Sequence, residues 1–412
     1  MTGVIWTRAR GSVVGAGLVG GSADILDFLL PLWAGEQLGA APGQIGALVA
    51  LELACSVVAR PVAGRLVDTR ERTRVAASGA VLFAVACLGY ALAPGLGAAF
   101  AAAATGGVGG ALLWIGVRAI TAERLDEDSG AFAGLFSAVA FASWFFWVPA
   151  VVLLPVLGYR GVFAALGLTC GLGAVALLRA PRSLRDAGGA VPPDRRVART
   201  LAPLLGVVVL TALAESGIGL LLLLHLQHAG LEVYQIALVQ APGGVALTLL
   251  PRPLHRLTAR HGRRAVYAVS ALGSAVCAAA LASDPAPPVV AALWVLAGVA
   301  WAASTPIHEA AVAQVSVGRT GRGMSLLGNA SLVGAALGSG AAGALYGVAS
   351  WPVACAVFAG AIGLGALAGP AALARMQIAD RPDVGDPART AERDGLPANA
   401  PGPVPADDRD RS

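Results

Sequence analysis

Charged residues are scarce in this chain of 412 residues: Asp, Glu, Lys and Arg together make up 13% of it, against 57% for hydrophobic residues. A soluble domain normally carries about 25% charged residues, so this composition excludes an ordinary soluble protein. A helix that spans a bilayer needs about 20 mostly apolar residues. Twelve such helices would take roughly 240 residues, which leaves room for short loops in a chain of this length.

Lysine is absent, so every one of the 29 cationic side chains is an arginine. The arginines form no basic face with interleaved aromatic residues, which excludes a nucleic-acid partner. The five cysteines stand singly in apolar segments without metal-ligand or redox spacing, so we expect no metal and no cofactor. The chain also has no G-x-x-x-x-G-K-[ST] phosphate loop, which excludes ATP hydrolysis by that route.

Twelve apolar segments follow one another along the chain, separated by turn residues such as Pro42-Gly43 and Asp284-Pro285. They cover residues 12–33, 43–64, 75–93, 96–118, 131–155, 160–179, 203–227, 234–254, 265–283, 287–308, 323–348 and 352–375. The first segment contains Asp24 and Asp27 and lacks a small-residue cleavage site, so we expect it to be retained as a helix. The sequence therefore predicts an all-α membrane protein with twelve transmembrane helices.

Positive charge alternates from loop to loop. Arginines precede the first segment and fill the loops after the even-numbered segments, whereas the loops after the odd-numbered segments hold Arg160 and little else that is positive. Cytoplasmic loops of membrane proteins carry an excess of Lys and Arg. This pattern predicts a multi-pass protein of the cytoplasmic membrane with both termini in the cytoplasm.

The longest arginine-rich loop, residues 180–200, separates six segments from six. We therefore expect an N-terminal six-helix bundle over residues 1–179, a cytoplasmic linker over 180–200 and a C-terminal six-helix bundle over 201–377. Residues 378–412 are rich in Pro, Asp and Arg and nearly free of large apolar side chains. Such a composition predicts a disordered cytoplasmic tail.

The two halves are related by an internal repeat. The run from Arg60 to Asp68, at the end of the second segment, has a counterpart that starts at Arg252, at the end of the eighth. An offset of about 191 residues relates the two runs, and the same offset pairs Asp24 with Glu215 and Arg118 with Glu309. Because charges are rare in these segments, we interpret the chain as a duplicated six-helix unit, an arrangement typical of transporters with parallel repeats.

The loop after the second segment resembles the signature loop of the major facilitator superfamily, G-x-L-x-D-R-x-x-R-[RK]. Gly64, Leu66, Asp68 and Arg72 match it, and the copy in the second half has Ala259 in place of the Asp. The resemblance implies two pseudo-symmetric six-helix bundles around a central cavity lined by the first, fourth, seventh and tenth helices. It also implies that Gly64, Asp68 and Arg72 form a gating loop, or latch, at the cytoplasmic side. Gly64 would let neighbouring helices approach closely. The alternative is that these arginines only set the topology.

Drug–proton antiporters of this superfamily often carry an Arg before a glycine pair in the fourth helix. Here Ala103 and Ala104 precede Gly106-Gly107, so that feature is missing.

Several charged side chains lie within or near the ends of the apolar segments. The candidates for proton or substrate binding are Asp24, Asp27, Glu52, Arg118, Glu215 and Glu309. An Asp or Arg at the centre of a membrane helix costs about 2.5–3.5 kcal/mol to insert, so such groups must line water, pair with one another or be protonated.

Asp24 and Asp27 are three residues apart and share one face of a helix, where two carboxylates resist simultaneous ionisation. The alternative is that one of them bridges to a neighbouring helix, with Arg118 as counter-ion. By the resemblance, Asp24, Arg118, Glu215 and Glu309 surround one chamber. Glu309 is alternatively interfacial, and Glu52 faces either the cavity or the seam with the eleventh helix.

Aromatic residues are few, at 6% of the chain, and several tryptophans fall on the predicted cavity helices and on the fifth helix. The candidate cavity aromatics are Trp114, Trp144, Trp147 and Trp301. An aromatic wall suits a flat or amphiphilic substrate, and the alternative is that each ring faces lipid or fills the core.

These observations together predict a secondary transporter and not an enzyme. We expect it to exchange protons for a small hydrophobic or amphiphilic compound, with the lipid bilayer as its surroundings and a monomer as its state. The first alternative is proton-coupled uptake of a small organic solute. A distant alternative is a membrane enzyme of prenyl-transfer type, since Asp24-Ile-Leu-Asp27 is similar to a diphosphate-binding motif, although no second Asp-rich motif occurs.

Overall fold

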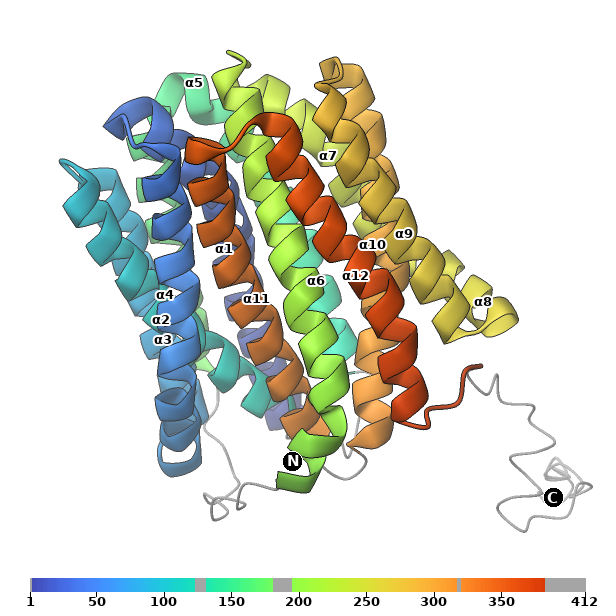
Figure 1. Ribbon diagram of the computed structural model, residues 1–412. Helices are drawn as coiled ribbons and strands as arrows, with labels where there is room; N and C mark the ends of the chain where they lie inside the picture. Colours follow the sequence, from blue (N-terminus) through green and yellow to red (C-terminus); the bar gives the residue numbers. More distant parts are fainter. Residues whose placement is uncertain (1, 123–130, 181–194, 317–319, 382–412) are drawn as a thin grey trace, which may run out of the picture.

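The computed structural model describes residues 2–122, 131–180, 195–316 and 320–381, and their regular structure is helical throughout. The helices run side by side and form one bundle (Figure 1). They are α1 (Thr2–Leu38), α2 (Pro42–Thr69), α3 (Arg72–Leu92), α4 (Leu96–Ala122), α5 (Ala131–Arg179), α6 (Arg195–His228), α7 (Val233–Leu249), α8 (Pro251–His261), α9 (Arg263–Ala280), the single 3-10 turn η1 (Leu281–Ser283), α10 (Pro287–Val315), α11 (Thr320–Val348) and α12 (Trp351–Arg375). Residues 181–194 of the predicted linker and 382–412 of the predicted tail lie outside the described residues.

The prediction of an all-helical membrane protein with twelve helices is confirmed, but three of the predicted segments are joined or broken differently. Among the described residues, ten helices are long and apolar enough to cross a bilayer. One of them, α5, contains the fifth and sixth predicted segments, which meet at Gly158, where φ is 64° and ψ is 172°. The eighth predicted segment breaks at Leu250 into α7 and the short helix α8, which carries Arg256 and Arg260 and projects from the bundle (Figure 1).

Each half packs mainly within itself. In the first half α1 lies against α5, α2 against α4, and α3 against both α4 and α5. In the second half α6 lies against α11 and α12, α9 against α12, and α10 against α7 and α9. The most extensive contact between the halves joins α2 to α11.

Glycines allow the close approach of α11 to its neighbours. A Cβ atom on Gly46 of α2 would lie 2.6 Å from the carbonyl oxygen of Ser339 and 2.8 Å from the Cα of Gly343. On its other side α11 places Gly338 against the backbone of α6 at Leu213. Small residues let membrane helices gain dispersion contacts and short backbone distances that larger side chains would prevent.

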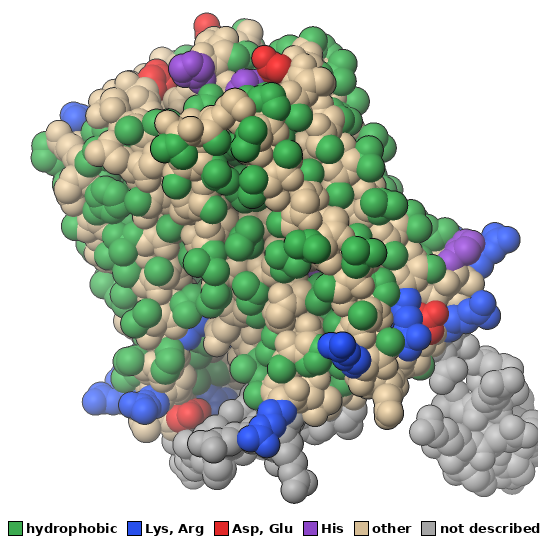
Figure 2. All heavy atoms as spheres, in the orientation of Figure 1, with side chains coloured by type: hydrophobic (Ala, Val, Ile, Leu, Met, Phe, Trp, Pro, Cys, Tyr) green, Lys and Arg blue, Asp and Glu red, His purple; other side chains and the backbone are tan. Residues whose placement is uncertain are grey.

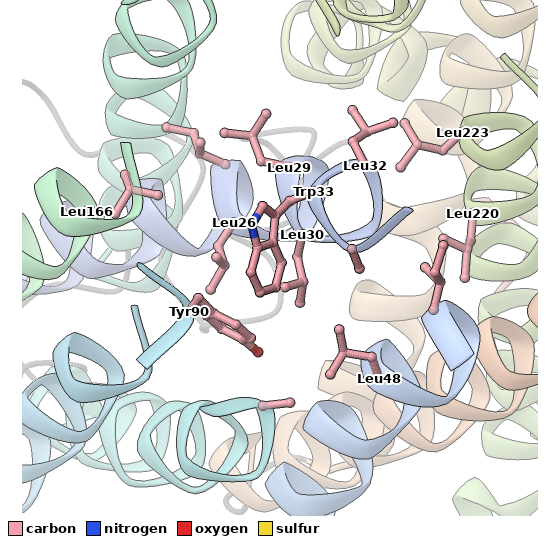
Figure 3. Packing of buried hydrophobic residues seen from close by; sticks show 14 of the residues in the cluster. Leu26, Leu29, Leu30, Leu32, Trp33, Leu48, Tyr90, Leu166, Leu220 and Leu223 are labelled. Carbon is pink, nitrogen blue, oxygen red and sulfur yellow. The ribbon is translucent and has the colours of Figure 1, made fainter. Parts of the chain in front are cut away.

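The apolar face of α1 lies at the centre of the core. Trp33 packs edge-on against Tyr90 of α3, at 5.9 Å between ring centroids, and against Phe163 of α5 at 5.4 Å. Leu48 of α2 and Leu220 and Leu223 of α6 belong to the same cluster, so side chains of both halves meet here (Figure 3). Edge-to-face aromatic pairs add about 0.5–1.5 kcal/mol beyond the area that they bury.

The arginines of the described residues gather at one end of the bundle, as the sequence pattern requires (Figure 2). We call this end of the bundle the arginine-rich end, and we call the other end, where Arg160 lies, the opposite end. The chain just after α12 is held at the arginine-rich end. Ile378 is buried, and the Asp380 carboxylate accepts the backbone N–H of Arg264 at 2.9 Å. Residues 378–381, the first four of the predicted tail, thus pack against the first turn of α9, and the disorder of the rest of the tail stays a prediction.

Substitution of Gly46 by Ala tests the seam between α2 and α11. The added Cβ meets backbone atoms, which cannot rotate away, so we expect the protein to lose about 1–3 kcal/mol of stability. Thermal unfolding of the protein in detergent measures the loss. Gly347→Ala, on α11, is the matched control, because its Cβ would meet no atom within 4 Å. Equal effects of the two substitutions would contradict the close packing at Gly46.

Candidate functional site

Asp24 and Asp27 lie together on the exposed side of α1. Both side chains are exposed, whereas Ile25 and Leu26 between them are buried. The Ser143 hydroxyl of α5 contacts a carboxylate oxygen of Asp24. Asp27 interacts electrostatically both with Asp24 and with Glu52 of α2. Asp24, Asp27 and Glu52 thus form a series of neighbouring carboxyl groups in the first half.

Glu52 lies against α3 and α4 and also interacts electrostatically with Asp27 of α1. The Tyr90 hydroxyl donates to the Glu52 Oε2 atom at 3.4 Å. A Cβ atom on Gly106 of α4 would lie 3.2 Å from Glu52 Oε1, and a Cβ on Gly107 would collide with the Glu52 carbonyl oxygen. The glycine pair of α4 therefore makes room for Glu52, a role that the sequence did not reveal.

Aromatic side chains of α5 flank the two aspartates. Trp147 lies 5.9 Å from Trp144 and 5.5 Å from Phe28 of α1, measured between ring centroids. The Trp144 indole N–H donates to the Thr248 hydroxyl of α7 at 3.2 Å, which joins the two halves. Trp114 of α4 packs on α1, since a Cβ on Gly20 would lie 3.4 Å from its ring. Three of the four predicted aromatics therefore surround the aspartate-bearing part of α1.

Arg118 lies toward α11 and α10. A Cβ atom on Gly328 of α11 would lie 3.1 Å from Arg118 Nη1 and 3.3 Å from Arg60 Nη1. Arg118 interacts electrostatically with the exposed Glu309 of α10, and Arg60 donates to the Asn329 side chain at 2.6 Å. Among the described residues no ion pair joins Arg118 to Asp24 or Asp27. These cationic and polar groups instead connect the first half to the second.

Glu215 does not face Asp24. It lines a small cavity of about 20 Å³ inside the second half, between α6, α9, α10 and α12. Trp301 lines the same cavity and packs edge-on against Trp294, at 5.3 Å between ring centroids. The prediction that Glu215 and Trp301 share one chamber with Asp24 is therefore not met, because both side chains turn into their own half.

The residues of the predicted latch lie at the end of α2 and the start of α3. Asp68 is exposed and has no hydrogen bond or ion pair with a described residue, although Arg72 begins α3 four residues later. A Cβ atom on Gly64 would meet nothing within 4 Å. Close helix approach is thus not the reason for a glycine at this position, and the gating role of Gly64, Asp68 and Arg72 stays a prediction.

A large vestibule at the opposite end was not predicted. It has a volume of about 1080 Å³ and lies between α1, α2, α5, α6 and α7, with Tyr346 of α11 at its rim. The Tyr159 hydroxyl donates to Glu36 at 2.8 Å, and the Gln227 side chain of α6 donates to the Leu32 carbonyl of α1 at 2.7 Å. One sequence signal was available, because three of the five tyrosines, Tyr159, Tyr234 and Tyr346, line this vestibule.

The chain folds into two helical halves that few hydrogen bonds join, and it carries carboxyl groups in the membrane region. These features define a polytopic membrane transport protein. The family model of the Major Facilitator Superfamily matches residues 13–254 and 204–402, so the chain belongs to this superfamily. The family establishes a secondary transporter and rules out the prenyl-transfer enzyme that the sequence had left open.

Solved structures with the same fold are distant in sequence. The nucleoside transporter NupG is 16% identical with a TM-score of 0.69, and the match covers 91% of this chain and all of NupG. The human organic anion transporter MFSD10 (TETRAN) is 18% identical with a TM-score of 0.62, covering 88% of this chain and 99% of that one. A POT family transporter in complex with a thioalcohol-conjugated peptide is 10% identical with a TM-score of 0.75, covering 90% and 96%. Among curated proteins, no match is found.

The hydrogen bond from Gln227 to Leu32 joins α6 to α1 at the vestibule. A hydrogen bond contributes about 0.5–1.5 kcal/mol, so Gln227→Ala should increase opening at this end by roughly 2- to 12-fold. Ile45, which lines the vestibule and is 2% exposed, reports this opening when replaced by Cys in a Cys55→Ala background. We expect faster labelling of that cysteine by a membrane-impermeant maleimide.

Gln37→Ala is the matched control for this experiment, because Gln37 also lines the vestibule but is exposed. It should leave the labelling rate unchanged. Unchanged labelling in Gln227→Ala as well would show that this hydrogen bond does not hold the opposite end closed.

Proposed function

We propose that this protein exports a small hydrophobic or amphiphilic compound in exchange for protons. The observation that carries the proposal is the pair of exposed carboxyl groups, Asp24 and Asp27, beside the aromatic side chains of α5. A carboxylate next to an apolar aromatic wall suits a neutral or cationic compound with a flat apolar part. The proposed membrane is the cytoplasmic membrane, with both termini and the arginine-rich end in the cytoplasm and the protein a monomer.

Proton exchange follows from the chemistry of the aspartate pair. Two carboxyl groups one helical turn apart repel each other when both are ionised, so one of them holds a proton more readily than an isolated aspartate does. A cationic or polar group of the cargo that approaches Asp24 favours release of that proton. Departure of the cargo restores the conditions for protonation, so substrate and proton bind in alternation.

The groups between the halves supply a second element of the proposed cycle. Arg118 and Glu309 belong to different halves and attract each other, while Arg60 is bonded to Asn329 across the same interface. Separation of the halves at the arginine-rich end breaks these contacts, and closure restores them. We assign Arg118 and Glu309 to this opening and closing. Glu52, which interacts electrostatically with Asp27, extends the aspartate pair into the interior of the first half.

Uptake of a small organic solute by proton symport is the alternative within the same fold. The nucleoside transporter NupG and the POT family transporter are too distant in sequence to decide between the two directions. Everted vesicles with an acidic interior separate the two directions. An exporter that exchanges protons for the compound concentrates the compound inside these vesicles, whereas a proton symporter for uptake does not.

Asp24→Asn and Asp27→Asn test the proposed proton exchange. Asparagine has nearly the shape of aspartate but takes up and releases no proton. Gradient-driven flux should therefore fall by roughly 5- to 150-fold, the factor to which coupling free energies usually correspond. Substrate–substrate exchange without a gradient should be retained, which separates loss of coupling from loss of folding. Flux in everted vesicles under an imposed pH gradient measures both.

The control for the aspartate variants is Asp284→Asn, the same chemical change at the opposite end, where Asp284 pairs with His225 at 2.7 Å. It should leave the response to the gradient intact. If Asp24→Asn and Asp27→Asn keep wild-type flux under the gradient, the coupling role of this pair is refuted.

Trp147→Ala tests the aromatic wall. The substitution removes the ring that packs against Phe28 and Trp144, and an aromatic pair contributes about 0.5–1.5 kcal/mol, so the KM for an amphiphilic substrate should rise roughly 2- to 12-fold. Phe145→Ala, at an exposed neighbouring ring of α5, is the control. A larger effect of Phe145→Ala than of Trp147→Ala would place the substrate on the other face of α5.

A further inference from the structure

Glu215 lies in a setting unlike that of any other carboxyl group described above. Its cavity is bordered by hydroxyl groups from three helices, Thr211 of α6, Ser270 and Ser274 of α9, and Ser304 of α10. No described residue forms a hydrogen bond or an ion pair with the Glu215 carboxylate, and no arginine lines the cavity. A charged carboxylate within a membrane helix is costly unless it lines water, is protonated or pairs with a cation.

Two further polar atoms around the cavity lack partners. The Tyr267 hydroxyl and the Trp301 indole N–H are buried and have no hydrogen bond, and Tyr267 as a whole is only 1% exposed. Buried polar groups in native proteins are hydrogen-bonded with few exceptions, and unsatisfied ones indicate a bound water or ion. The cavity measures about 20 Å³, which exceeds the ~10–15 Å³ needed for the centre of one water-sized sphere.

From this geometry we propose that the Glu215 cavity binds one sodium ion together with water. Carboxylate and hydroxyl oxygens are the ligands that hard cations prefer. The cavity offers one negative charge, so a monovalent ion is neutralised, whereas a divalent ion would leave a buried net charge of +1. The water accepts the N–H of Trp301, which no cation can do.

The sodium site is distinct from the aspartate pair and does not depend on proton exchange there. It lies within the second half, so it is available to couple a second ion to transport. A smaller cavity shares Ser274, Trp301 and Ile362 with it and continues toward Leu281, at the opposite end.

Sodium binding is tested on the full chain, purified in detergent, with radioactive ²²Na⁺ and by thermal unfolding in NaCl against choline chloride at equal ionic strength and pH. We expect one bound ion per chain and a midpoint higher by about 2–4 °C in sodium. Glu215→Gln should abolish both. Should that variant fail to fold, the double substitution Ser270→Ala with Ser274→Ala keeps the carboxylate and should weaken sodium binding at least about tenfold.

Ser283→Ala is the matched control, since Ser283 follows α9 but lies outside the cavity and donates to the Ala280 carbonyl. It should bind sodium as the wild type does, and so should Asp24→Asn, which separates this site from the proposed proton exchange. The proposal is overturned if saturating sodium neither binds nor stabilises the wild type, if potassium acts equally, or if Glu215→Gln still binds sodium. A midpoint that responds to pH but not to sodium would make Glu215 a proton-binding group instead.

Discussion

A carboxyl group inside a bilayer has no bulk water to solvate it, and the arrangement of this protein's interior follows from that constraint. Each charged side chain in the membrane region is accommodated in a different way. Asp24 and Asp27 are exposed on α1, and Asp24 accepts a hydrogen bond from Ser143. Glu52 is paired with the Tyr90 hydroxyl, and Glu215 is surrounded by serine and threonine hydroxyls. The neighbouring helices of each carboxyl group, more than its place in the sequence, determine which groups it can bind.

The contact between the halves combines a tight seam with a small number of polar bonds. The seam consists of small residues at which α2 and α11 approach closely, as at Gly46 and Gly343. Away from it, single hydrogen bonds join the halves: Gln227 to Leu32 near the opposite end, Trp144 to Thr248, and Arg60 to Asn329. Each such bond contributes about 0.5–1.5 kcal/mol, so few of them need to be exchanged when one half rocks against the other. This is the energetic requirement of alternating access in a transporter built from two repeats.

The internal repeat relates positions but not environments. Asp24 and Glu215 correspond to each other through the offset of about 191 residues, yet Asp24 is exposed beside α5 whereas Glu215 lines a small cavity among α6, α9, α10 and α12. The same divergence applies to Arg118 and Glu309, which carry opposite charge at equivalent positions and attract each other across the interface. The duplicated unit has therefore become a pair of halves in which equivalent positions have different neighbours. Carboxyl groups lie near aromatic side chains in the first half, and Glu215 shares a cavity with serine and threonine side chains in the second.

The sequence by itself determined the twelve helices, the arginine-rich end and the superfamily. These features depend on local rules, because about 20 apolar residues form a membrane helix wherever they occur and arginine stays outside the hydrocarbon region. It did not determine which neighbour each side chain meets. Trp301 and Glu215 turn into their own half, Gly64 faces open space, and Glu36, Tyr159 and Gln227 form a vestibule from segments far apart in the chain. Only the tertiary structure decided these contacts, since the rotation of each helix about its axis is set by packing against helices distant in sequence.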